Sequence, residues 1–509
     1  MKRWFASGTP WIWLNAGALT ISMVMVVGLL ALITVRGLAH FWPDPVVEYA
    51  AGGGRILGIR IEREIGPDGA PRLLIKQGNR DLTGRDFVWH DEAALGAARL
   101  PRDAIIVERR SWGDLQGYLR APDPATLAEQ LARSNALIAE AQAIERYEIG
   151  AVNARVERLR LAQRATPSLD ISAEMRVLDA EYEALRVRLG ALEQAAQRDS
   201  MTVEVADGSL HELPLLRVVD AYQPNAMGFG DKLTHYFGKI WAFLSDYPRE
   251  ANTEGGIFPA IFGTVMMVMI MSVVVTPFGV LAAIYLREYA KQGPLTRIIR
   301  ISVNNLAGVP SIVFGVFGLG FFVYTVGGQI DQLFYETALP APTFGTPGLI
   351  WVSLTLALLT LPVVIVSTEE GLTRIPRAIR EGSLALGATK AETLWKIVVP
   401  VAAPAMMTGL ILAVARAAGE VAPLMLVGVV KLAPNLPVDA TFPFLHLERK
   451  IMHLGFHIYD VGFQSPNSEA ARPLVYATAL VLVALIMVLN LSAIAIRNHL
   501  REKYRADSD

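Results

Sequence analysis

The sequence predicts a mainly α-helical, polytopic membrane protein that carries one large aqueous insertion. Hydrophobic residues make up 52% of its 509 residues, which is too many for a soluble chain and too few for a chain embedded throughout. Six apolar runs are each long enough to cross a hydrocarbon core of about 30 Å. A polar stretch, residues 40–255, separates the first run from the other five.

Net charge and cysteine content restrict the classes of partner and site. The formal net charge is -1, which argues against nucleic acid as a partner. The chain has no cysteine, so thiolate metal sites and disulfides are excluded. We expect no metal site, because His453 and His457 are four positions apart and have no evident third ligand.

The chain lacks the sequence signs of catalysis and of nucleotide binding. The segment Gly387-Ala388-Thr389-Lys390 misses the leading glycine of a phosphate-binding loop and the Ser or Thr after its lysine. No nucleophile, base and orienting group occur at a recognisable spacing. We therefore expect a non-enzymatic chain that binds no cofactor itself, with any ATP and Mg²⁺ held by a partner chain.

The first apolar run, Trp11–Val35, is predicted to remain in the membrane. It is longer than the core of a signal peptide, and no small-residue cleavage site follows it. Residues 1–39 are therefore predicted to form a cytoplasmic end and the first transmembrane helix.

The insertion, residues 40–255, contains two kinds of pattern. β-Prone runs lie toward its ends, and a Gly66-Pro67-Asp68-Gly69 turn joins the first two: 55–62, 72–76, 104–108 and 202–205. Between them, at about 125–199, apolar residues recur in steps of four and three: Ile171, Met175, Leu178, Tyr182, Leu185, Leu189, Leu192 and Ala196. A matching stripe precedes them: Ile149, Val152, Val156 and Leu159.

This spacing predicts an antiparallel coiled-coil hairpin with its turn at 165–170. At 1.5 Å per residue its first arm would be about 60 Å long. A lever, a docking arm and a plain spacer all fit, because a heptad seam specifies a partner helix and not a purpose.

Residues 256–509 are predicted to form the transmembrane domain. An aromatic, amphipathic segment, 232–247, precedes it and is expected at the membrane interface. The five apolar runs are Ile257–Leu286, Ile301–Val326, Leu349–Val366, Val401–Val430 and Leu474–Ile496.

Charges in the connections predict the orientation. Lys and Arg gather after the second, fourth and sixth runs, whereas the connection 327–346 contains neither. The positive-inside rule then places both termini and the segment 374–400 in the cytoplasm, and the insertion outside.

The segment Glu381–Pro400 is predicted to be a two-part helical element between the fourth and fifth runs. Gly387 follows Glu381 by six residues, and Ile397 follows Gly387 by ten. Thr389 and Glu392 form a capping-box pattern that restarts a helix after the glycine. The expected product is helix, glycine turn, helix, and the alternative is an ordinary amphipathic connector.

Arg416 lies near the bilayer midplane when residues are counted along the fifth run, and Glu420 is one turn further on the same face. A lone guanidinium in hydrocarbon costs at least about 3 kcal/mol, so it must face protein or water. The pair is either an internal staple between helices or an anion filter, in which Arg416 offers forked donors and Glu420 moderates the charge.

Polar residues in the third run mark a second candidate site. Asn304, Asn305 and Gly308 precede Pro310 and Ser311, which predicts a half-helix that starts inside the membrane at Ser311. Its free N–H groups would attract an anion. The alternative is a kinked helix whose asparagines bond to neighbouring helices.

Two sets of motifs resemble a known family. The spacing of Glu381, Gly387, Ile397 and Pro400 resembles the EAA loop of ABC importer permeases, with Gly382, Ser383 and Val399 replacing its two alanines and its leucine. The runs Asn305–Gly315, Ser367–Gly371, Leu384–Thr389 and Ala415–Glu420 resemble those of PstA-type permeases of the phosphate importer.

The resemblance covers about half the chain, residues 263–497, and leaves the insertion out. It implies a MetI-like permease core in a bacterial inner membrane, paired with a second, PstC-like permease, an ATPase dimer and a periplasmic phosphate-binding protein. It also implies that Arg416 and Glu420 lie in the phosphate path. ATPase coupling would use Glu381, Gly387, Ala388, Thr389, Ile397 and Pro400.

Two other functions stay open at this point. An importer of another oxyanion would use an arginine in its path equally well. A membrane-anchored periplasmic scaffold or sensor would use the coiled coil as its working part and the spans only as an anchor.

Overall fold

The computed structural model describes residues 7–52, 54–465 and 468–506, so the predicted cytoplasmic end at residues 1–6 lies outside the described part. Within that part, the predicted six apolar spans are confirmed by six helices of sufficient length and hydropathy: Trp11–Ala39, Phe258–Tyr289, Ser311–Phe334, Leu349–Thr373, Lys390–Gly419 and Ala471–His499.

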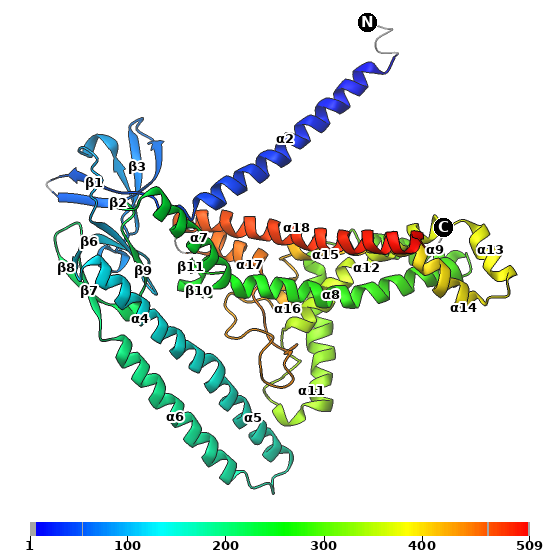
Figure 1. The fold of residues 1–509 in the computed structure, drawn as a ribbon. Helices are drawn as coiled ribbons and strands as arrows, with labels where there is room; N and C mark the ends of the chain where they lie inside the picture. The colour runs from blue at the N-terminus through cyan, green and yellow to red at the C-terminus, as the bar shows by residue number, and fades with distance from the viewer. Residues whose placement is uncertain (1–6, 53, 466–467, 507–509) are drawn as a thin grey trace.

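Helix α12 (Leu349–Thr373) is the centre of the membrane bundle. It packs against α8 (Phe258–Ile284) and α15 (Val399–Gly419), and α15 packs against α18 (Ser468–Ala506). Helix α2 (Thr9–Ala39) contacts α18 and then diverges from it, as Figure 1 shows. The core contains the buried side chains of Met267, Met271, Trp351, Leu356 and Ala417.

The predicted range of the third run, 301–326, is wrong, although the predicted helix start at Ser311 is confirmed. The chain forms α9 (Pro294–Leu306), breaks, and restarts as α10 (Ser311–Phe317). Pro310 has no N–H to donate, and it disfavours helical geometry in the residue before it, so α9 cannot continue. The span then continues as the π-helix η6 (Gly318–Gly327) and as α11 (Gly328–Phe334).

The predicted range of the fifth run, Val401–Val430, is wrong at its far end. Helix α15 ends at Gly419, and Glu420 is extended, with φ -76° and ψ 135°. Pro423 lacks the N–H that would bond the carbonyl of Gly419, so the helix cannot run through it. A separate short helix, α16 (Leu424–Val427), follows.

The insertion contains two large antiparallel sheets, and the strands β10 and β11 near its end pair as a small third sheet. The first has the order β1-β2-β3-β4, with strands Val46–Ala51, Gly54–Ile65, Pro71–Lys76 and Phe87–Asp91. The second has the order β8-β7-β6-β5-β9, with strands Leu210–Pro214, Ser200–Glu204, Leu115–Ala121, Ala104–Arg109 and Val218–Tyr222. The runs that the sequence marks as β-prone overlap β2, β3, β5 and β7.

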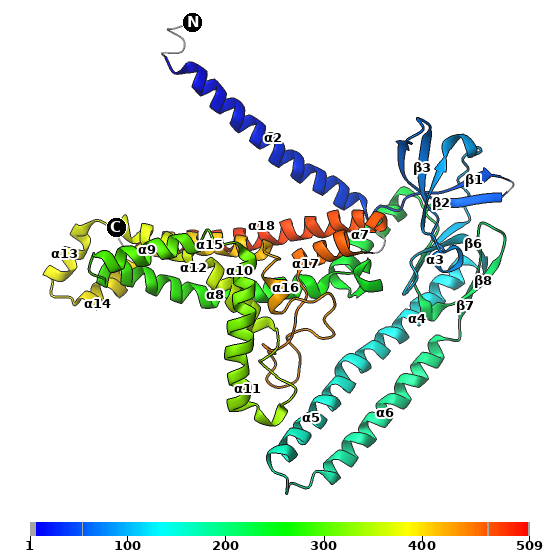
Figure 2. The ribbon, with the colours of Figure 1, turned by 180° about the vertical axis from the view of Figure 1, so that it is seen from behind.

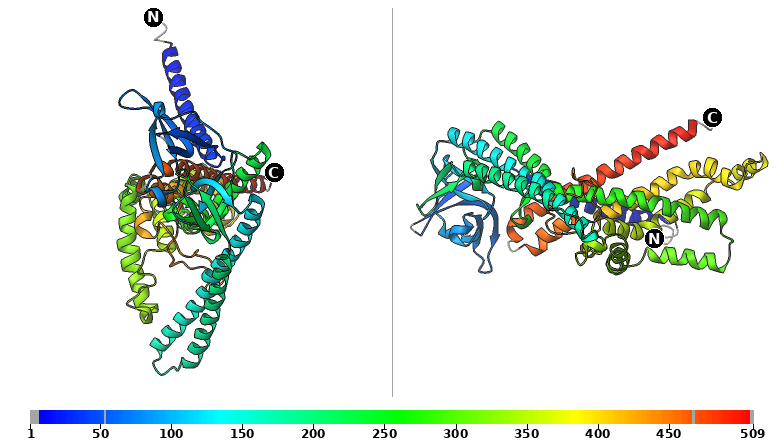
Figure 3. Two further views of the ribbon diagram at one scale, coloured as in Figure 1. Left: turned by 90° about the vertical axis from the view of Figure 1, so that its left-hand side faces the viewer. Right: turned by 90° about the horizontal axis from the view of Figure 1, so that it is seen from below.

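A helical hairpin connects β6 to β7. Its first arm is α4 (Pro124–Ala143), η2 (Ile144–Ile149) and α5 (Gly150–Ala165), and its second arm is α6 (Ser172–Ala196), which packs against both α4 and α5 (Figures 1 and 3). Tyr182 is exposed and therefore departs from the expected seam. Its neighbour Glu181 contacts the first arm by pairing with Arg155.

The hairpin tip folds back onto the membrane domain. Arg164 Nη1 donates to the carbonyl oxygen of Thr337 at 3.1 Å, in the short helix η7 (Glu336–Ala338) that follows α11. The hairpin therefore bridges the sheets of the insertion and the connection between the third and fourth spans.

Helix α7 (Phe229–Ser245) joins the insertion to the bundle. Lys239 Nζ bonds Glu108 at 2.6 Å and Asp220 at 2.7 Å, which ties α7 to β5 and β9. Phe243 packs on Phe41 at the end of α2, with ring centroids 5.1 Å apart. The remaining short elements are α3 (Arg80–Thr83), β10 (Pro248–Arg249), β11 (Glu254–Gly255) and α17 (Leu454–Tyr459).

Candidate functional site

The first candidate site is the elbow, which we define as residues 377–400. Helix α13 (Arg377–Ala385) ends in a Schellman motif, in which the Ala388 N–H donates to the Ser383 carbonyl at 3.2 Å and the Gly387 N–H donates to the Leu384 carbonyl at 3.0 Å. Gly387 has φ +87°, a left-handed conformation that favours glycine. The predicted glycine turn is confirmed.

The second half of the elbow begins with the predicted capping box. The Thr389 hydroxyl accepts the Glu392 N–H at 3.2 Å, and the Glu392 carboxylate accepts the Thr389 N–H at 3.0 Å. Helix α14 (Lys390–Thr393) runs through the π-turn η8 (Leu394–Val398) into α15, so any push on the elbow acts directly on a spanning helix.

The elbow is fastened to the end of α8. Arg380 donates to the Glu288 carboxylate at 2.9 Å and to two carbonyl oxygens, those of Ile375 and Leu372. The buried hydroxyls of Ser383 and Thr393 are 2.9 Å apart and link the two halves. These contacts therefore tie the elbow to the ends of α8 and α12.

The outward surface of the elbow is apolar at its centre. Leu386 at the turn is 91% exposed, and Ile379, Leu384 and Trp395 are exposed beside it. Glu381 is exposed as well, whereas Ala388, Ile397 and Pro400 are half-buried. Exposed apolar residues rimmed by charges are typical of a protein contact surface. Figure 2 shows the elbow at the opposite end of the bundle from the insertion.

The second candidate site is the Arg416–Glu420 pair. Arg416 Nε lies 3.5 Å from Glu420 Oε1, and their side chains are 35% and 19% exposed. Because α15 ends at Gly419, Arg416 is in the last turn of the helix, and its position near the bilayer midplane stays a prediction. Within the described residues, the Arg416 guanidinium makes no hydrogen bond, so its donors remain available.

The start of α10 lies near this pair. A Cβ on Gly315 would lie 2.7 Å from Pro423 Cα, so α10 packs closely against the turn that follows Glu420. Ser311 is the first residue of α10 and is half-buried. Asn305 is exposed in the last turn of α9. The structure thus places the middle of α10, and not Ser311 itself, against the turn that follows Glu420.

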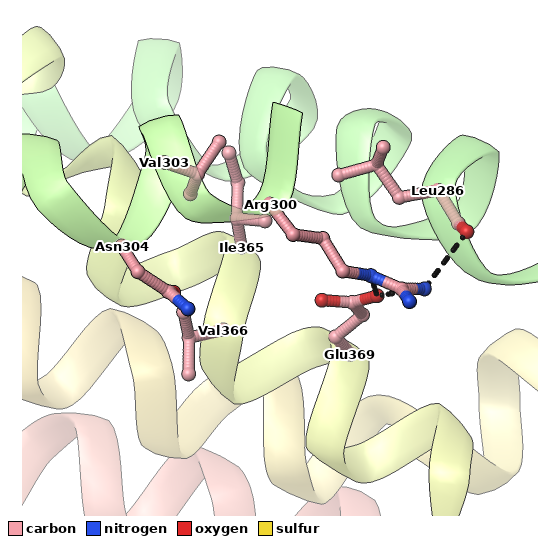
Figure 4. A pocket seen from close by; sticks show the side chains of 7 residues that line it. All are labelled: Leu286, Arg300, Val303, Asn304, Ile365, Val366 and Glu369. Carbon is pink, nitrogen blue, oxygen red and sulfur yellow. Dashed lines mark hydrogen bonds and ion pairs between the residues drawn. The ribbon is translucent and has the colours of Figure 1, made fainter. Parts of the chain in front are cut away.

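Asn304 belongs to a different place. It lines a cavity of about 30 Å³ between α9, α12 and the π-turn η5 (Tyr285–Tyr289) that follows α8, together with Arg300 and Glu369 (Figure 4). A cavity of this size holds about one or two water molecules. Asn304 therefore lies beside a second Arg–Glu pair and not beside Arg416.

Arg300 in this cavity makes three hydrogen bonds within the protein. It donates to Glu369 Oε1 at 2.8 Å, to Gln292 Oε1 at 3.0 Å and to the Leu286 carbonyl at 3.1 Å. Sequence reasoning misses this pair, because its two residues are 69 positions apart. A usable signal exists only for Glu369, which belongs to the Ser367–Gly371 run.

Known proteins are similar in sequence to the part of the chain that contains these sites. Residues 275–506 match the family described as "Binding-protein-dependent transport system inner membrane component". The phosphate transport system permease protein PstA 1 of Mycobacterium tuberculosis (strain CDC 1551 / Oshkosh) is 34% identical over 244 residues, which cover 48% of this chain and 71% of the relative. PstA of Mycobacterium leprae is 35% identical over 48% of this chain and 71% of the relative.

The chain belongs to the PstA family of phosphate transport permeases. PstA of Yersinia pestis is a further relative, 31% identical over 50% of this chain and 77% of its own length. Among solved structures, an inward-facing MetNI methionine ABC transporter chain is 18% identical over 52% of this chain and 98% of that chain, with a TM-score of 0.35.

The match to the binding-protein-dependent transport family includes the candidate sites. The elbow, the Arg416–Glu420 pair, Asn304, Asn305 and Ser311 all lie within residues 275–506. The two sheets and the hairpin lie before that range. His453, outside the sites, caps α17 by accepting the Phe456 N–H at 3.3 Å, and the described residues contain no group of three or more potential metal ligands.

Proposed function

We propose that this chain forms one half of the anion path of its importer and that partner ATPases drive it through the elbow. The chain is an inner-membrane permease of a phosphate ABC importer. The observation that carries the mechanism is the elbow itself: an apolar outer surface on a unit that is fastened to α8 and continuous with α15. A force on Leu386 therefore reaches two spanning helices.

Its partners in this proposal are an ATPase dimer at the elbow, a second, PstC-like permease in the bilayer and a periplasmic phosphate-binding protein. ATP and Mg²⁺ are held by the ATPases. The exposed apolar side chains of the elbow support the first contact, and membership of a binding-protein-dependent family supports the last. The elbow binds in the groove of an ATPase and tilts as the nucleotide sites close.

The proposed orientation places the elbow and both termini in the cytoplasm and the insertion, 40–255, in the periplasm. The distribution of Lys and Arg supports this placement. The elbow and the insertion also lie at opposite ends of the bundle, as two compartments require (Figure 2).

The proposed anion path passes Arg416. Its guanidinium has free donors in a fork that matches the oxygens of a phosphate ion, and Glu420 limits the net attraction so that the ion can leave. Ser311 and Asn305, which flank the break before α10, are proposed as further polar groups of the path. Asn304 lines the separate cavity at Arg300. It is proposed to belong to the path only if the anion also passes that cavity.

Two glycine variants of the elbow test the coupling. A Cβ on Gly387 or on Gly382 meets no atom within 4 Å, but only Gly387 has a positive φ. Gly387→Ala therefore strains the turn by about 1–2 kcal/mol, whereas Gly382→Ala lies in an ordinary helical conformation. In the reconstituted complex we expect Gly387→Ala to lower ATP-driven uptake several-fold and Gly382→Ala to leave it unchanged.

Equal uptake by both variants, at equal assembly with the ATPase, would contradict the coupling role. The scaffold or sensor function is not favoured, because the chain belongs to a permease family. If the chain were a scaffold or sensor, deletion of 125–197 would abolish its function. A permease with the same deletion is expected to keep basal transport.

A further inference from the structure

The connection that follows α16 carries a loop with an apolar surface, which we call the aromatic loop and define as residues 436–449. Phe442 and Phe444 in this loop are 73% and 56% exposed, and their ring centroids are 6.0 Å apart. Val438 and Leu445 are exposed as well, and they pair with each other across the loop. Figure 1 shows the segment after α16 projecting from the bundle on the side of α11. Two exposed aromatic rings offer a large contact area to another molecule.

The ionisable residues of the aromatic loop bond to one another. His446 is buried and lies 3.0 Å from Asp439 and 3.1 Å from Glu448. Arg449 Nη1 lies 2.6 Å from Asp439 Oδ2. The first exposed charge after the loop is Lys450. The exposed residues of 436–449, a range that the structure describes throughout, are all apolar: Val438, Ala440, Phe442, Pro443, Phe444 and Leu445.

The backbone of the aromatic loop is strained at one of its two exposed rings. Phe444 has φ +68°, a left-handed conformation that bulky residues rarely adopt. Its N–H donates to the Thr441 carbonyl at 2.7 Å, and its carbonyl accepts the Asp439 N–H at 3.1 Å. Strain of this kind costs about 1–3 kcal/mol. More than half of the ring is exposed, so contacts within the chain offset little of this cost. A partner that covers the ring supplies the missing contacts.

The aromatic loop is fastened to the end of α12 that lies away from the elbow. The carbonyls of Arg449 and Leu447 accept the N–H groups of Leu349 and Ile350, at 2.8 Å and 2.9 Å. The elbow follows the other end of α12, at Thr373, and a helix of 25 residues is about 37 Å long. The ATPases proposed at the elbow are therefore not the molecules that cover the aromatic loop.

The composition of the loop distinguishes a permanent partner from a transient one. A soluble phosphate-binding protein binds and leaves, and charged groups across an interface favour fast and specific association of that kind. The aromatic loop exposes no charge within 436–449. Permanent interfaces are more hydrophobic, and the centre of an interface is poor in charged residues and rich in aromatic ones. The aromatic loop therefore fits a subunit that stays bound.

We propose that the aromatic loop binds the second permease subunit of the importer, with Phe442 and Phe444 as the anchoring side chains. The proposal rests on the proposed function, which includes that subunit. A few aromatic anchors commonly supply most of the binding energy of an interface. The two permeases then meet at the end of α12 that is opposite to the ATPases.

Photo-crosslinking tests the contact. The chain is coexpressed and purified with the second permease and the ATPase, and purified phosphate-binding protein is added to one half of the sample. Phe442 is replaced by p-benzoylphenylalanine, and mass spectrometry identifies the adducts that form on illumination. We expect an adduct with the second permease, with and without the binding protein. The same probe in place of Ile65, which is 77% exposed in the insertion, is expected to form no adduct with that subunit.

Two serine variants measure how much the anchor contributes. Phe442→Ser and Phe463→Ser each remove an exposed ring, and Phe463 lies outside the aromatic loop, in the π-turn η9 (Asp460–Gln464). Phe442→Ser is expected to lower the amount of copurified second permease several-fold, and Phe463→Ser to keep it within about two-fold. Thermal unfolding of the full chain alone should be unchanged in both variants, because neither ring is buried.

Three results would overturn the proposal and leave the proposed function standing: an adduct with the phosphate-binding protein only, an adduct with lipid only, or no adduct in a complex that contains the second permease. Equal losses in the two serine variants would also overturn it. A complex of the unmodified chain that contains no second permease would remove this proposal together with that part of the proposed function.

Discussion

Two arginines in the membrane domain are equally exposed but differently held. Arg300 and Arg416 are 31% and 35% exposed, and each faces a glutamate that is about one-fifth exposed. Arg300 donates to a carboxylate, an amide oxygen and a backbone carbonyl, whereas Arg416 has one carboxylate at 3.5 Å and no hydrogen bond within the described residues.

The different hydrogen bonding of Arg300 and Arg416 indicates that one arginine has a structural role and the other a role in transport. An arginine that makes several hydrogen bonds within the protein holds helices together, and removing it leaves a partly buried carboxylate unpaired. An arginine with free donors in a bilayer is costly unless something else binds it. We therefore assign Arg300 to the integrity of the bundle and Arg416 to the passing anion.

The largest effect is expected from Arg416→Ala. Loss of its charge-assisted hydrogen bonds to phosphate should lower uptake about 10- to 100-fold, while the amount of assembled complex stays the same. Uptake of labelled phosphate per assembled complex measures this. Arg416→Lys keeps the charge but not the fork and should retain part of the activity. Unchanged uptake in Arg416→Ala would remove the distinction between the two arginines.

The converse effect is expected from Arg300→Ala. It leaves Glu369 without its partner and should destabilise the membrane domain by about 1–3 kcal/mol. Thermal unfolding in detergent and the yield of assembled complex report this loss. The complexes that do assemble should transport at a rate close to that of the unmodified chain, and a full loss of uptake at normal stability would reverse the assignment.

A smaller effect is expected from Glu420→Gln, which removes the charge that faces Arg416. The anion is then held more tightly, so both KM and the maximal uptake rate should fall several-fold. Glu369→Gln at the other pair should lower stability instead, because Arg300 loses its carboxylate. Similar kinetics for the two glutamine variants would mean that the pairs have the same role.

Local signals made the elbow predictable. The turn at Gly387 and the capping box at Thr389 need only residues within a few positions of one another, and the structure has both. The ends of the third and fifth spans were harder, because hydropathy does not register a break in the backbone. Pro310 and Pro423 were the available signals for those breaks.

Contacts between distant segments could not be predicted. The Arg300–Glu369 pair joins α9 to α12, and neither residue predicts the other. The heptad pattern predicts a partner for α6, but it says nothing of where the hairpin ends, so the contact of Arg164 with Thr337 required the structure. Tyr182 fits the heptad spacing and still points outward, since Glu181 pairs with Arg155.

Competition for uptake tests the central claim most directly. The chain is reconstituted with its permease, ATPase and binding-protein partners in liposomes, and entry of labelled phosphate is measured with an excess of arsenate or of sulfate. The account predicts uptake that requires ATP, is suppressed by arsenate, which shares the charge and shape of phosphate, and is little affected by sulfate. Uptake without ATP, or equal suppression by sulfate, would contradict it.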